Sequence, residues 1–424
     1  MAGGLRSGVS QDDPAVLRED EVGPLAVAIL DGRVAAVGRE RDVQAQVIGQ
    51  GMDVGGLPRL DAAGGTVTPG LLDPHTHLLF RGTRERELAL RQQGRAYLDI
   101  LAGGGGILAT VEATRAASDE DLLDHGRRWL DRMLASGVTT AEVKSGYGLD
   151  VATELRLLGL YRRLGSEGPV ELVPTFLGAH AVPAEYHERA GDTDDYVTDV
   201  IERQLPAAAS QGIARFCDVF CEPGVFDLTA SRLILKAARA LGLRLRLHAD
   251  ELHDSSGAAL AAELGATSAD HLGAVSAAGI EALGRAADEG QPVVATLLPA
   301  TTLYLMRERH APARKLIDRG VPVALGTDFN PGTSPTASLP LVMSLACILL
   351  HMTAAEALAA VTINAAHALA LGDTHGALAA GRVGDVLIWS VPRHELIPYW
   401  IGANLVQAVV KRGHVVSVKP RAGA

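Results

Sequence analysis

The sequence contains few aromatic residues and few cysteines. Phe, Trp and Tyr make up 4% of the 424 residues, and there are three cysteines. A sparse, odd-numbered set of cysteines excludes a disulfide-stapled scaffold and fits a reduced, cytoplasmic protein. With so few aromatic rings, the core must be built mainly from Ala, Val, Leu and Ile, and a hydrophobic content of 47% is enough for a large one.

Long apolar runs and an excess of positive charge are also lacking. No stretch of about 18 uncharged apolar residues occurs, so we expect no segment that spans a membrane. Residues 1–14 lack an apolar signal core and are expected to be a flexible extension. Lys and Arg number 39 against 50 Asp and Glu, a net charge of −11. This charge argues against a nucleic-acid partner, and an anionic substrate would need a local cationic residue.

The middle of the chain alternates short apolar runs with longer amphipathic segments. The expected strands are Val67–His77, Thr139–Lys144, Val170–His180, Arg215–Cys221, Leu243–Ala249, Ala266–His271, Pro292–Leu298 and Pro322–Asp328. Helical patterns lie between most of these strands, and one of the expected helices is capped by Ser118. Eight such units predict an α/β fold, a (β/α)8 TIM barrel over residues 67–372. A doubly wound sheet is the alternative, but it requires a glycine-rich phosphate turn directly after the first strand. The glycines at 103–106 stand elsewhere and indicate a flexible loop.

Both ends of the chain carry β signals of a different kind. Asp31-Gly32 interrupts the run AVAILDGRVAAVG and favours a two-residue hairpin turn. Strand-like runs return at residues 381–391 and 405–416. We expect the two ends to meet as one small, discontinuous, β-sandwich-like domain. Its parts would be residues 1–66, of which the first ~20 are expected to be flexible, and residues 373–424.

Histidine and acidic residues stand at the carboxyl ends of the expected strands, where barrel enzymes carry their chemistry. His75 and His77 end the first strand two residues apart, so both imidazoles can face one metal ion. The other strand ends carry His180, His248 with Glu251, Asp270 with His271, and Asp328. A single histidine is usually packed or solvated. Five histidines and an aspartate at the strand ends of one barrel predict a metal centre.

This arrangement resembles the amidohydrolase superfamily, whose barrels carry His-x-His on strand one, His on strands five and six, and Asp on strand eight. The resemblance covers nearly the whole chain. It implies one zinc or iron ion per subunit, held by His75, His77, His248 and Asp328. The expected fourth strand lacks the carboxylated lysine that bridges two metals in one branch of the superfamily. Glu222 at its end is left as a candidate for a second ion, and Cys217 and Cys221 are expected in the core.

Longer motifs resemble the imidazolonepropionase family within this superfamily. They include DPHTHLLFRGTRERE, EVKSGYGL, TFLGAHAVP, HADEL and GTDFNPGTSPT. The resemblance implies hydrolysis of the cyclic amide of 4-imidazolone-5-propanoate to N-formimidoyl-L-glutamate, a step of histidine breakdown, by a homodimer. The alternative is another amidohydrolase reaction, such as deamination of a purine or pyrimidine, which the same His248, Glu251 and His271 also suit. A non-catalytic scaffold would lack metal ligands, and all four are present.

The reaction assigns roles to the residues around the metal. Glu251 is the expected general acid and base and also contacts the substrate, taking a proton from water and giving it to the leaving ring nitrogen. Asp328 is the alternative base, and His271 would orient the water or polarise the carbonyl. The resemblance singles out Arg84 as the anchor for the propanoate carboxylate. It assigns further substrate contacts to Tyr147, His180, Asn330, Gly332 and Thr333.

Overall fold

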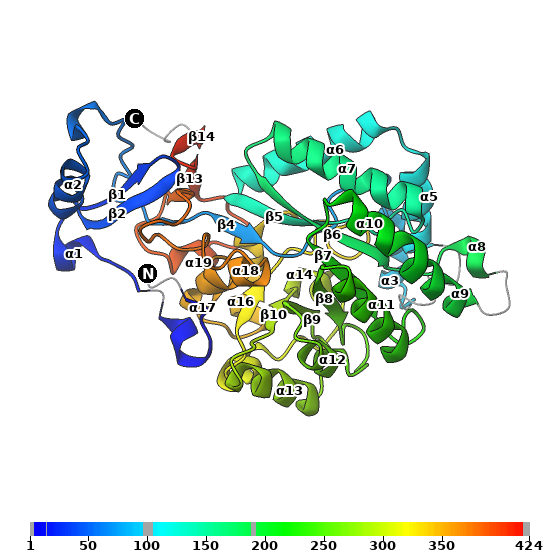
Figure 1. The fold of residues 1–424 in the computed structure, drawn as a ribbon. Coiled ribbons are helices and arrows are strands. Elements are labelled where there is room, and N and C mark those ends of the chain that lie inside the picture. The colour runs from blue at the N-terminus through cyan, green and yellow to red at the C-terminus, as the bar shows by residue number, and fades with distance from the viewer. Residues whose placement is uncertain (1–3, 14, 96–104, 188–191, 419–424) are drawn as a thin grey trace.

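The computed structural model describes residues 4–13, 15–95, 105–187 and 192–418. Among these residues, eight parallel strands form one sheet, and each strand pairs with its neighbours in the sequence (Figure 1). They are β4 (Leu71–Asp73), β5 (Val138–Lys144), β6 (Glu171–Ala179), β7 (Phe216–Cys221), β8 (Arg244–Ala249), β9 (Ser268–His271), β10 (Val294–Leu297) and β11 (Val323–Leu325). This sequential order is that of a barrel and excludes the doubly wound alternative.

The barrel is closed by contacts between the segments that follow its first and last strands. Thr76 and Phe329 form a parallel bridge. The His77 N–H donates to the Phe329 carbonyl at 2.8 Å, and the Asp328 N–H donates to the His75 carbonyl at 2.9 Å. The structure therefore confirms the predicted (β/α)8 barrel, and it closes at the residues that were expected to carry the chemistry.

Helices surround the sheet (Figure 1). They are α3 (Glu85–Gln92), α5 (Ile107–Ala116), α6 (Asp119–Ala135), α7 (Val151–Glu167), α8 (Ala184–His187), α9 (Asp192–Asp199), η3 (Val200–Gln204), α10 (Leu205–Gln211), α11 (Leu228–Ala240), α12 (Gly257–Glu263), α13 (Ala277–Asp288), α14 (Pro299–Tyr304), α15 (Ala313–Asp318), α16 (Leu339–Leu349), α17 (Ala354–Ala360) and α18 (Ile363–Ala368). The Ser118 hydroxyl caps α6 by accepting the Asp121 N–H, and Leu122, Leu130 and Met133 on its apolar face are buried.

The amphipathic pattern from Thr353 to Leu369 predicts one helix, and the structure contains two. α17 begins at a capping box formed by Thr353 and Glu356. It ends before Val361 and Thr362, where the backbone of Thr362 leaves the helical region with φ −124° and ψ −97°. Both residues are β-branched and restrict the helix, and the Thr362 hydroxyl donates to the Leu358 carbonyl.

Strands from the two chain ends lie side by side at one end of the molecule (Figure 1). The hairpin β1 (Leu25–Leu30) and β2 (Arg33–Arg39) turns at Asp31 and Gly32, which both have positive φ as the predicted turn requires. The second sheet has the order β14 (His414–Val418), β13 (Val406–Lys411), β12 (Val386–Trp389), β3 (Val67–Pro69). The hairpin packs on it through a cluster that contains Val34, Val386 and Val410. The remaining helices at this end are α1 (Glu19–Val22), α2 (Glu40–Gly49) and η2 (Val54–Gly56), whereas α19 (Leu396–Tyr399) contacts the barrel helix α16.

The expected first strand, Val67–His77, is divided between the two sheets. β3 pairs with β12, with Thr68 opposite Leu387, whereas β4 pairs with β5 in the barrel. Gly70 lies between the two short strands, and a Cβ there would be 2.3 Å from the Thr139 hydroxyl oxygen. The chain can therefore pass from one sheet into the other only at a residue without a side chain, and residues 67–69 lie in the small sheet rather than in the barrel.

The first residues were expected to be a flexible extension, but the described part has a defined place on the barrel. Residues Gly8–Asp12 form the short 3-10 helix η1. The Gln11 side chain is fully buried, donates to the carbonyls of Val323 and Glu356, and accepts the Val323 N–H. Gln11 thus supplies hydrogen-bond partners to backbone groups at the start of β11.

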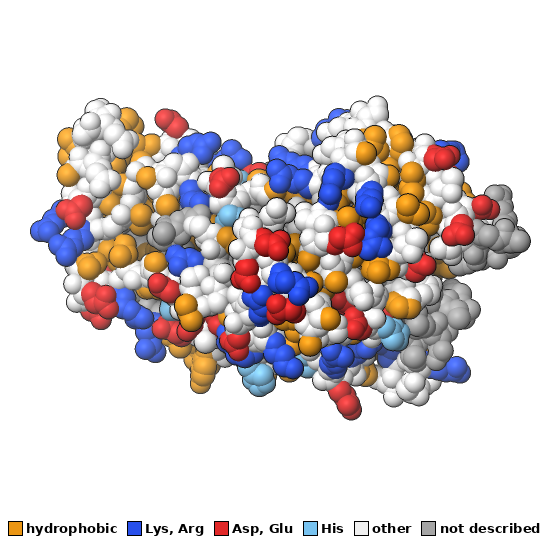
Figure 2. All heavy atoms as spheres, turned by 60° about the horizontal axis from the view of Figure 1, so that its bottom comes forward, with side chains coloured by type: hydrophobic (Ala, Val, Ile, Leu, Met, Phe, Trp, Pro, Cys, Tyr) orange, Lys and Arg blue, Asp and Glu red, His pale blue; other side chains and the backbone are white. Residues whose placement is uncertain are grey.

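The surface carries intermingled charges of both signs (Figure 2). Arg319 lies 2.8 Å from Glu281 and 2.9 Å from Asp288, and Arg232 lies 2.7 Å from Glu263. Such exposed pairs contribute about 0–1 kcal/mol each to stability. Their main consequence is that these arginines are locally neutralised, as the excess of acidic residues leads one to expect.

Candidate active site

The carboxyl ends of the barrel strands bring the predicted histidines and acids into one buried cluster. His75 and His77 follow β4, His248 lies in β8, and Asp328 follows β11. All four side chains are at most 3% exposed. His180 follows β6, and His271 ends β9 at the edge of the same cluster.

The ligand atoms of the four expected metal ligands converge. The Nε2 atoms of His75 and His77 lie 3.5 and 3.4 Å from Oδ1 of Asp328. Ligand atoms bound at 2.0–2.2 Å in a tetrahedral zinc site are separated by roughly this distance. The His248 ring belongs to two further groups whose ligand atoms lie within 4.8 Å of one another, one with His75 and His271 and one with His77 and His180. The cluster could therefore hold a metal ion.

Two aspartates orient the imidazoles of this cluster. Nδ1 of His75 lies 2.7 Å from Oδ2 of Asp270, and Nδ1 of His248 lies 3.0 Å from Oδ2 of Asp218. A carboxylate at Nδ1 keeps the proton there and leaves the Nε2 lone pair for a metal. Nε2 of His75 is buried and has no hydrogen-bond partner. Burial lowers the pKa of His75 well below its ordinary value, so the ring is neutral, which is the form that binds metals.

A network of buried charges lies around these aspartates, and it was not anticipated from the sequence. The Lys144 ammonium lies 2.8 Å from both Glu142 and Asp218, and the Arg246 guanidinium lies 2.9 Å from Asp270. Burial disfavours the charged form of Lys144, but Asp218 and Glu142 outweigh it and raise its pKa. One part of this network could have been predicted from the sequence. Arg246 precedes His248 by two residues in the same strand, so its side chain faces the same side as that of His248.

Glu251 and His271 lie close together at the edge of the cluster. Oε2 of Glu251 lies 3.5 Å from Nε2 of His271, and the latter has no hydrogen-bond partner. Burial, followed by repulsion from Asp328 and Glu222, raises the pKa of Glu251 well above its ordinary value. Burial also raises the pKa of Asp328, although Thr301 donates a hydrogen bond to it at 2.6 Å. A carboxyl group with a raised pKa can both accept and donate a proton near neutral pH.

Glu222, the candidate for a second metal ion, is engaged elsewhere. Its carboxylate lies 2.6 Å from Nδ1 of His253 and accepts the Leu252 N–H at 3.1 Å. Among the described residues, the groups that could hold a metal do not include Glu222. The structure thus gives Glu222 a role in holding residues 252–253 and gives no support to a second ion. Cys217 and Cys221 are buried and free, as expected.

Arg84 is held in a buried cluster with two charged residues of α3. Its Nε and Nη2 atoms donate to the Glu87 carboxylate at 2.9 and 2.8 Å, and Arg91 Nη1 lies 4.0 Å from the same carboxylate. Glu87 also accepts the Gly106 N–H at 2.8 Å. With two arginines and one glutamate, this cluster keeps a net positive charge beside the histidines. Gly103 and Gly104 of the glycine run lie outside the described residues.

The segment after Asp328 forms a tight turn against Arg84. Oδ1 of Asn330 accepts the N–H groups of Gly332 and Thr333 at 2.8 and 2.7 Å. The Asn330 side chain thus engages both N–H groups and shapes the turn. A Cβ on Gly332 would lie 2.0 Å from Nη1 of Arg84, so this glycine makes room for the guanidinium.

A narrow cavity of about 40 Å³ joins these groups, enough for a few water molecules. It is lined by His77, Arg84, Ile107, Tyr147, His180, Phe220, His248, Glu251, His271, Asp328, Asn330 and Thr333. The predicted substrate contacts other than Gly332 are among these residues. His77 stacks on His180 with ring centres 4.8 Å apart, and Tyr147 lies 5.5 Å from His180.

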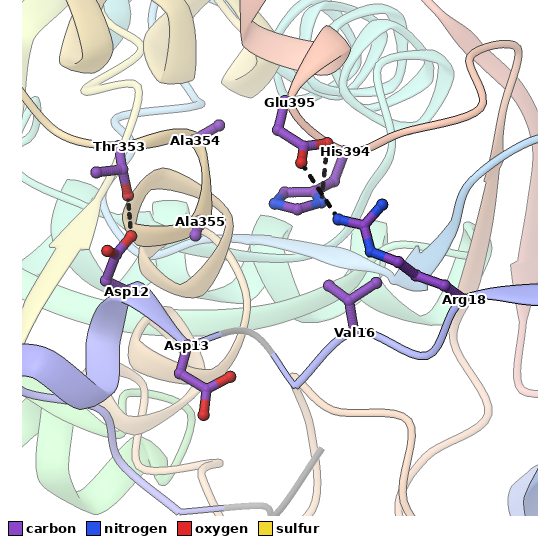
Figure 3. Close-up of a pocket in the computed structure, with 9 residues that line it drawn as sticks. All are labelled: Asp12, Asp13, Val16, Arg18, Thr353, Ala354, Ala355, His394 and Glu395. Carbon is purple, nitrogen blue, oxygen red and sulfur yellow. Dashed lines mark hydrogen bonds and ion pairs between the residues drawn. The ribbon is translucent and has the colours of Figure 1, made fainter. Parts of the chain in front are cut away.

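A larger cavity of about 380 Å³ lies at the surface, between the N-terminal segment and α17 (Figure 3). Two of its acidic side chains have partners within the lining: Arg18 lies 3.5 Å from Glu395, and Asp12 accepts a hydrogen bond from Thr353. None of its lining residues belongs to the histidine cluster. The smaller cavity, with its unpartnered imidazole nitrogens, is therefore the candidate active site.

Comparison with known proteins agrees with this geometry. The sequence profile described as "Amidohydrolase family" matches residues 66–416. The chain belongs to the amidohydrolase family. Within it, the chain is 48% identical to the imidazolonepropionase of Alkaliphilus metalliredigens (strain QYMF) over 395 residues, 93% of this chain and 90% of the relative. It is also 48% identical to the imidazolonepropionase of Bacillus velezensis over 417 residues, 98% and 93% of the two chains.

Solved structures show the amidohydrolase fold at low sequence identity. The 5-methylcytosine deaminase of Klebsiella pneumoniae superposes with a TM-score of 0.71 at 16% identity, covering 94% of this chain and 96% of the deaminase. Guanine deaminase of E. coli gives a TM-score of 0.66 at 15% identity, covering 93% of each chain. At these identities the two deaminases show a shared fold alone, so they do not favour the deaminase alternative. Among the described residues, no helix is long and apolar enough to cross a membrane.

Proposed function

We propose that this protein is a metal-dependent hydrolase that opens the cyclic amide of 4-imidazolone-5-propanoate to give N-formimidoyl-L-glutamate. The observation that carries the proposal is the convergence of His75, His77 and Asp328 at the end of a cavity that Glu251 and Arg84 also line. The relatives of near 48% identity carry the name imidazolonepropionase. The ring opening is one step of histidine breakdown.

His75, His77, His248 and Asp328 would hold one zinc or iron ion. Such an ion supplies a water ligand whose pKa is lowered from 15.7 to about 7, and it polarises a carbonyl oxygen. Three imidazoles and one carboxylate would leave a coordination position open for water, as catalytic sites require. The buried Asp270 keeps the His75 ring in the tautomer that presents Nε2.

Glu251 transfers the proton that the reaction needs. Addition of water to the ring carbonyl releases a proton, and departure of the ring nitrogen consumes one. Glu251 lines the cavity beside His271 and has a raised pKa, so it can accept the first proton and donate it to the nitrogen. His271 has an unpartnered Nε2 at 6% exposure, and in this reaction it orients the water or the carbonyl oxygen. Asp328 is the alternative base.

Arg84 binds the propanoate carboxylate, and Tyr147, His180, Asn330, Gly332 and Thr333 surround the rest of the substrate. The net positive charge of the Arg84, Glu87 and Arg91 cluster compensates for the negative charge of the whole protein at this point. The substrate ring is larger than the cavity of about 40 Å³, so side chains at its mouth must move apart when substrate binds.

One experiment tests the function directly. Metal analysis of the purified protein is followed by an assay with 4-imidazolone-5-propanoate. We expect about one zinc or iron ion per chain, loss of the imidazolone absorbance, and formimidoylglutamate as the product. Ammonia release from purine or pyrimidine substrates, without imidazolone turnover, would instead establish the deaminase alternative.

Replacement of Arg84 tests the carboxylate anchor. We expect Arg84→Ala to raise KM about 10- to 100-fold with a smaller effect on kcat, because a hydrogen bond to a charged group contributes about 1.5–3 kcal/mol, mostly to ground-state binding. Steady-state kinetics measure this effect. The double variant Arg84→Ala/Glu87→Gln avoids an unpaired buried carboxylate, and Arg86→Ala is the control at an exposed neighbour. An unchanged KM in both Arg84 variants would place the anchor elsewhere.

We further propose a cytoplasmic homodimer. The three cysteines are free, as in a reducing compartment. Tyr399, Trp400 and Ile401 are contiguous and 53–67% exposed, which makes them candidates for a subunit interface. Light scattering after size-exclusion chromatography should give twice the mass of one chain, and Trp400→Ser should shift the protein toward the single-chain mass. A wild-type protein that elutes as a monomer at micromolar concentration contradicts the dimer.

A further inference from the structure

Glu154 is a buried carboxylate that reaches the candidate active site only through the backbone. It lies in the first turn of α7, and the residue is 1% exposed. Its Oε1 accepts the N–H groups of Gly146, Gly148 and Leu149 at 3.0, 2.8 and 2.9 Å. Oε2 also accepts from Gly146 at 3.0 Å. One carboxylate thus satisfies three backbone donors of a single loop.

The loop that Glu154 holds connects β5 to α7 and carries Tyr147. The Gly146 carbonyl lies 2.9 Å from Nδ1 of His180. A carbonyl can only accept, so Nδ1 of His180 carries a proton. The loop therefore determines both the place of Tyr147 and the tautomer of His180.

Two glycines allow the loop to lie this close to Glu154 and His180. Gly146 has a φ of +96°, and a Cβ there would lie 2.9 Å from Nδ1 of His180. A Cβ on Gly148 would lie 2.7 Å from the Glu154 N and 2.8 Å from its carboxylate. The backbone conformation and the close approach thus both require glycine in this loop.

Two further side chains, those of Arg115 and Tyr196, contact the carbonyl groups of the same loop. The Arg115 guanidinium donates to the Gly148 carbonyl at 2.6 Å. The Tyr196 hydroxyl lies 2.6 Å from the Gly178 carbonyl and 3.2 Å from the Leu149 carbonyl, and so it links this loop to the end of β6, which leads to His180. The loop is therefore fixed on both sides, and Glu154 supplies its acceptors for N–H groups.

We propose that Glu154 is a positioning residue that acts through residues 146–149 to place Tyr147 and to set the tautomer of His180 for substrate binding. This inference rests on the proposed function for its kinetic consequence. Burial raises the pKa of Glu154, whereas the hydrogen bonds from Ser145 and from the loop N–H groups act in the opposite direction. A glutamine that keeps its oxygen at the Oε1 position would direct its NH2 group at the Gly146 N–H, which Oε2 now accepts, so its shape alone cannot replace the carboxylate.

The test compares Glu154→Gln with Glu167→Gln in the full-length, zinc-loaded protein. Glu167 lies at the other end of the same helix and is exposed. We expect Glu154→Gln to retain its zinc and to lose about 10- to 100-fold in kcat/KM, comparable to loss of one to two hydrogen bonds to a charged group. Glu167→Gln should match the wild type. The conservative variant Glu154→Asp keeps the charge and should recover part of the loss.

A spectroscopic readout separates positioning from general stability. NMR spectra of 15N-histidine-labelled protein should show the Nδ1–H tautomer for His180. Loss of a signal in the His180→Asn variant assigns it to this residue. In Glu154→Gln, we expect the His180 ring to become a mixture of tautomers. If Glu154→Gln does not fold, Glu154→Asp carries the same measurement. A double-mutant cycle with Tyr147→Phe should give non-additive losses, because both changes act on one loop.

Two outcomes overturn the inference. The first is wild-type kcat/KM in zinc-loaded Glu154→Gln, and the second is an unchanged His180 tautomer in that variant. The tautomer measurement needs no substrate. If the wild-type protein does not open the imidazolone ring, the proposed function fails, and the tautomer alone decides whether Glu154 positions the loop.

Discussion

Asp328→Ala will release the metal and abolish the activity together. Asp328 supplies the carboxylate of the proposed ligand set, and both neighbouring Nε2 atoms converge on its Oδ1. Without it, two buried imidazoles keep no anionic partner at this point, and the metal loses a quarter of its protein ligands. Elemental analysis after dialysis and the imidazolone assay measure the two losses. Full activity in a protein that contains no metal would contradict the proposed chemistry.

The design of this test depends on the backbone at position 328. Asp328 has a φ of +52°, a conformation that Asp and Asn tolerate better than Ala. Asp328→Asn therefore keeps the shape and the backbone conformation while it removes the charge, and it should fold while binding metal more weakly than the wild type. Asp318→Ala is the control, because Asp318 is exposed and pairs with Arg314 at the surface. It should leave metal content and turnover unchanged.

Glu251→Gln will retain the metal and lose turnover. Glutamine has nearly the same shape as glutamate but cannot accept and return a proton, and transfer by a positioned side chain contributes about 10²–10⁴ to the rate. We expect kcat to fall by that factor while metal content stays near one per chain and KM changes little. Steady-state kinetics alongside metal analysis check the result, and Glu289→Gln at an exposed position is the control.

The two variants also distinguish the possible bases. If Glu251 is the proton shuttle, Glu251→Gln loses turnover at full metal occupancy. If Asp328 is the base, Glu251→Gln keeps a rate near that of the wild type, and the assignment to Glu251 is then wrong. Because Oε2 of Glu251 lies 3.5 Å from His271, a His271→Asn variant with reduced turnover and retained metal would support the pair.

The barrel and its strand ends could be predicted because they depend on local patterns. Period-two apolar runs identify buried strands, and parallel strands in a barrel bring their carboxyl ends together, so His75, His248 and Asp328 could be grouped before any contact was known. The prediction of α6 also used local information, since the cap at Ser118 and the apolar face define this helix. In each case the signal lies within a few residues of the element that it predicts.

The features that were missed depend on contacts between distant segments. The division of Val67–His77 follows from the approach of Gly70 to Thr139, which no local pattern reveals. The pairing of Lys144 with Asp218 joins β5 and β7, and a sequence shows only two charged residues in apolar strands. Likewise, the closeness of Glu154 to the loop at 146–149 arises from a turn whose conformation is set by two glycines.

The closure of the barrel has a consequence for folding as well as for chemistry. The Thr327 N–H and hydroxyl donate to Asp73 at 3.0 and 2.6 Å, across a sequence separation of 254 residues. A metal ion held by His75, His77 and Asp328 would cross-link the chain at this same seam, and it would offset the entropy cost of joining segments so far apart. Removal of the ion would therefore loosen the seam first, and amide hydrogen exchange at His77 and Asp328 would rise before that of the other barrel strands.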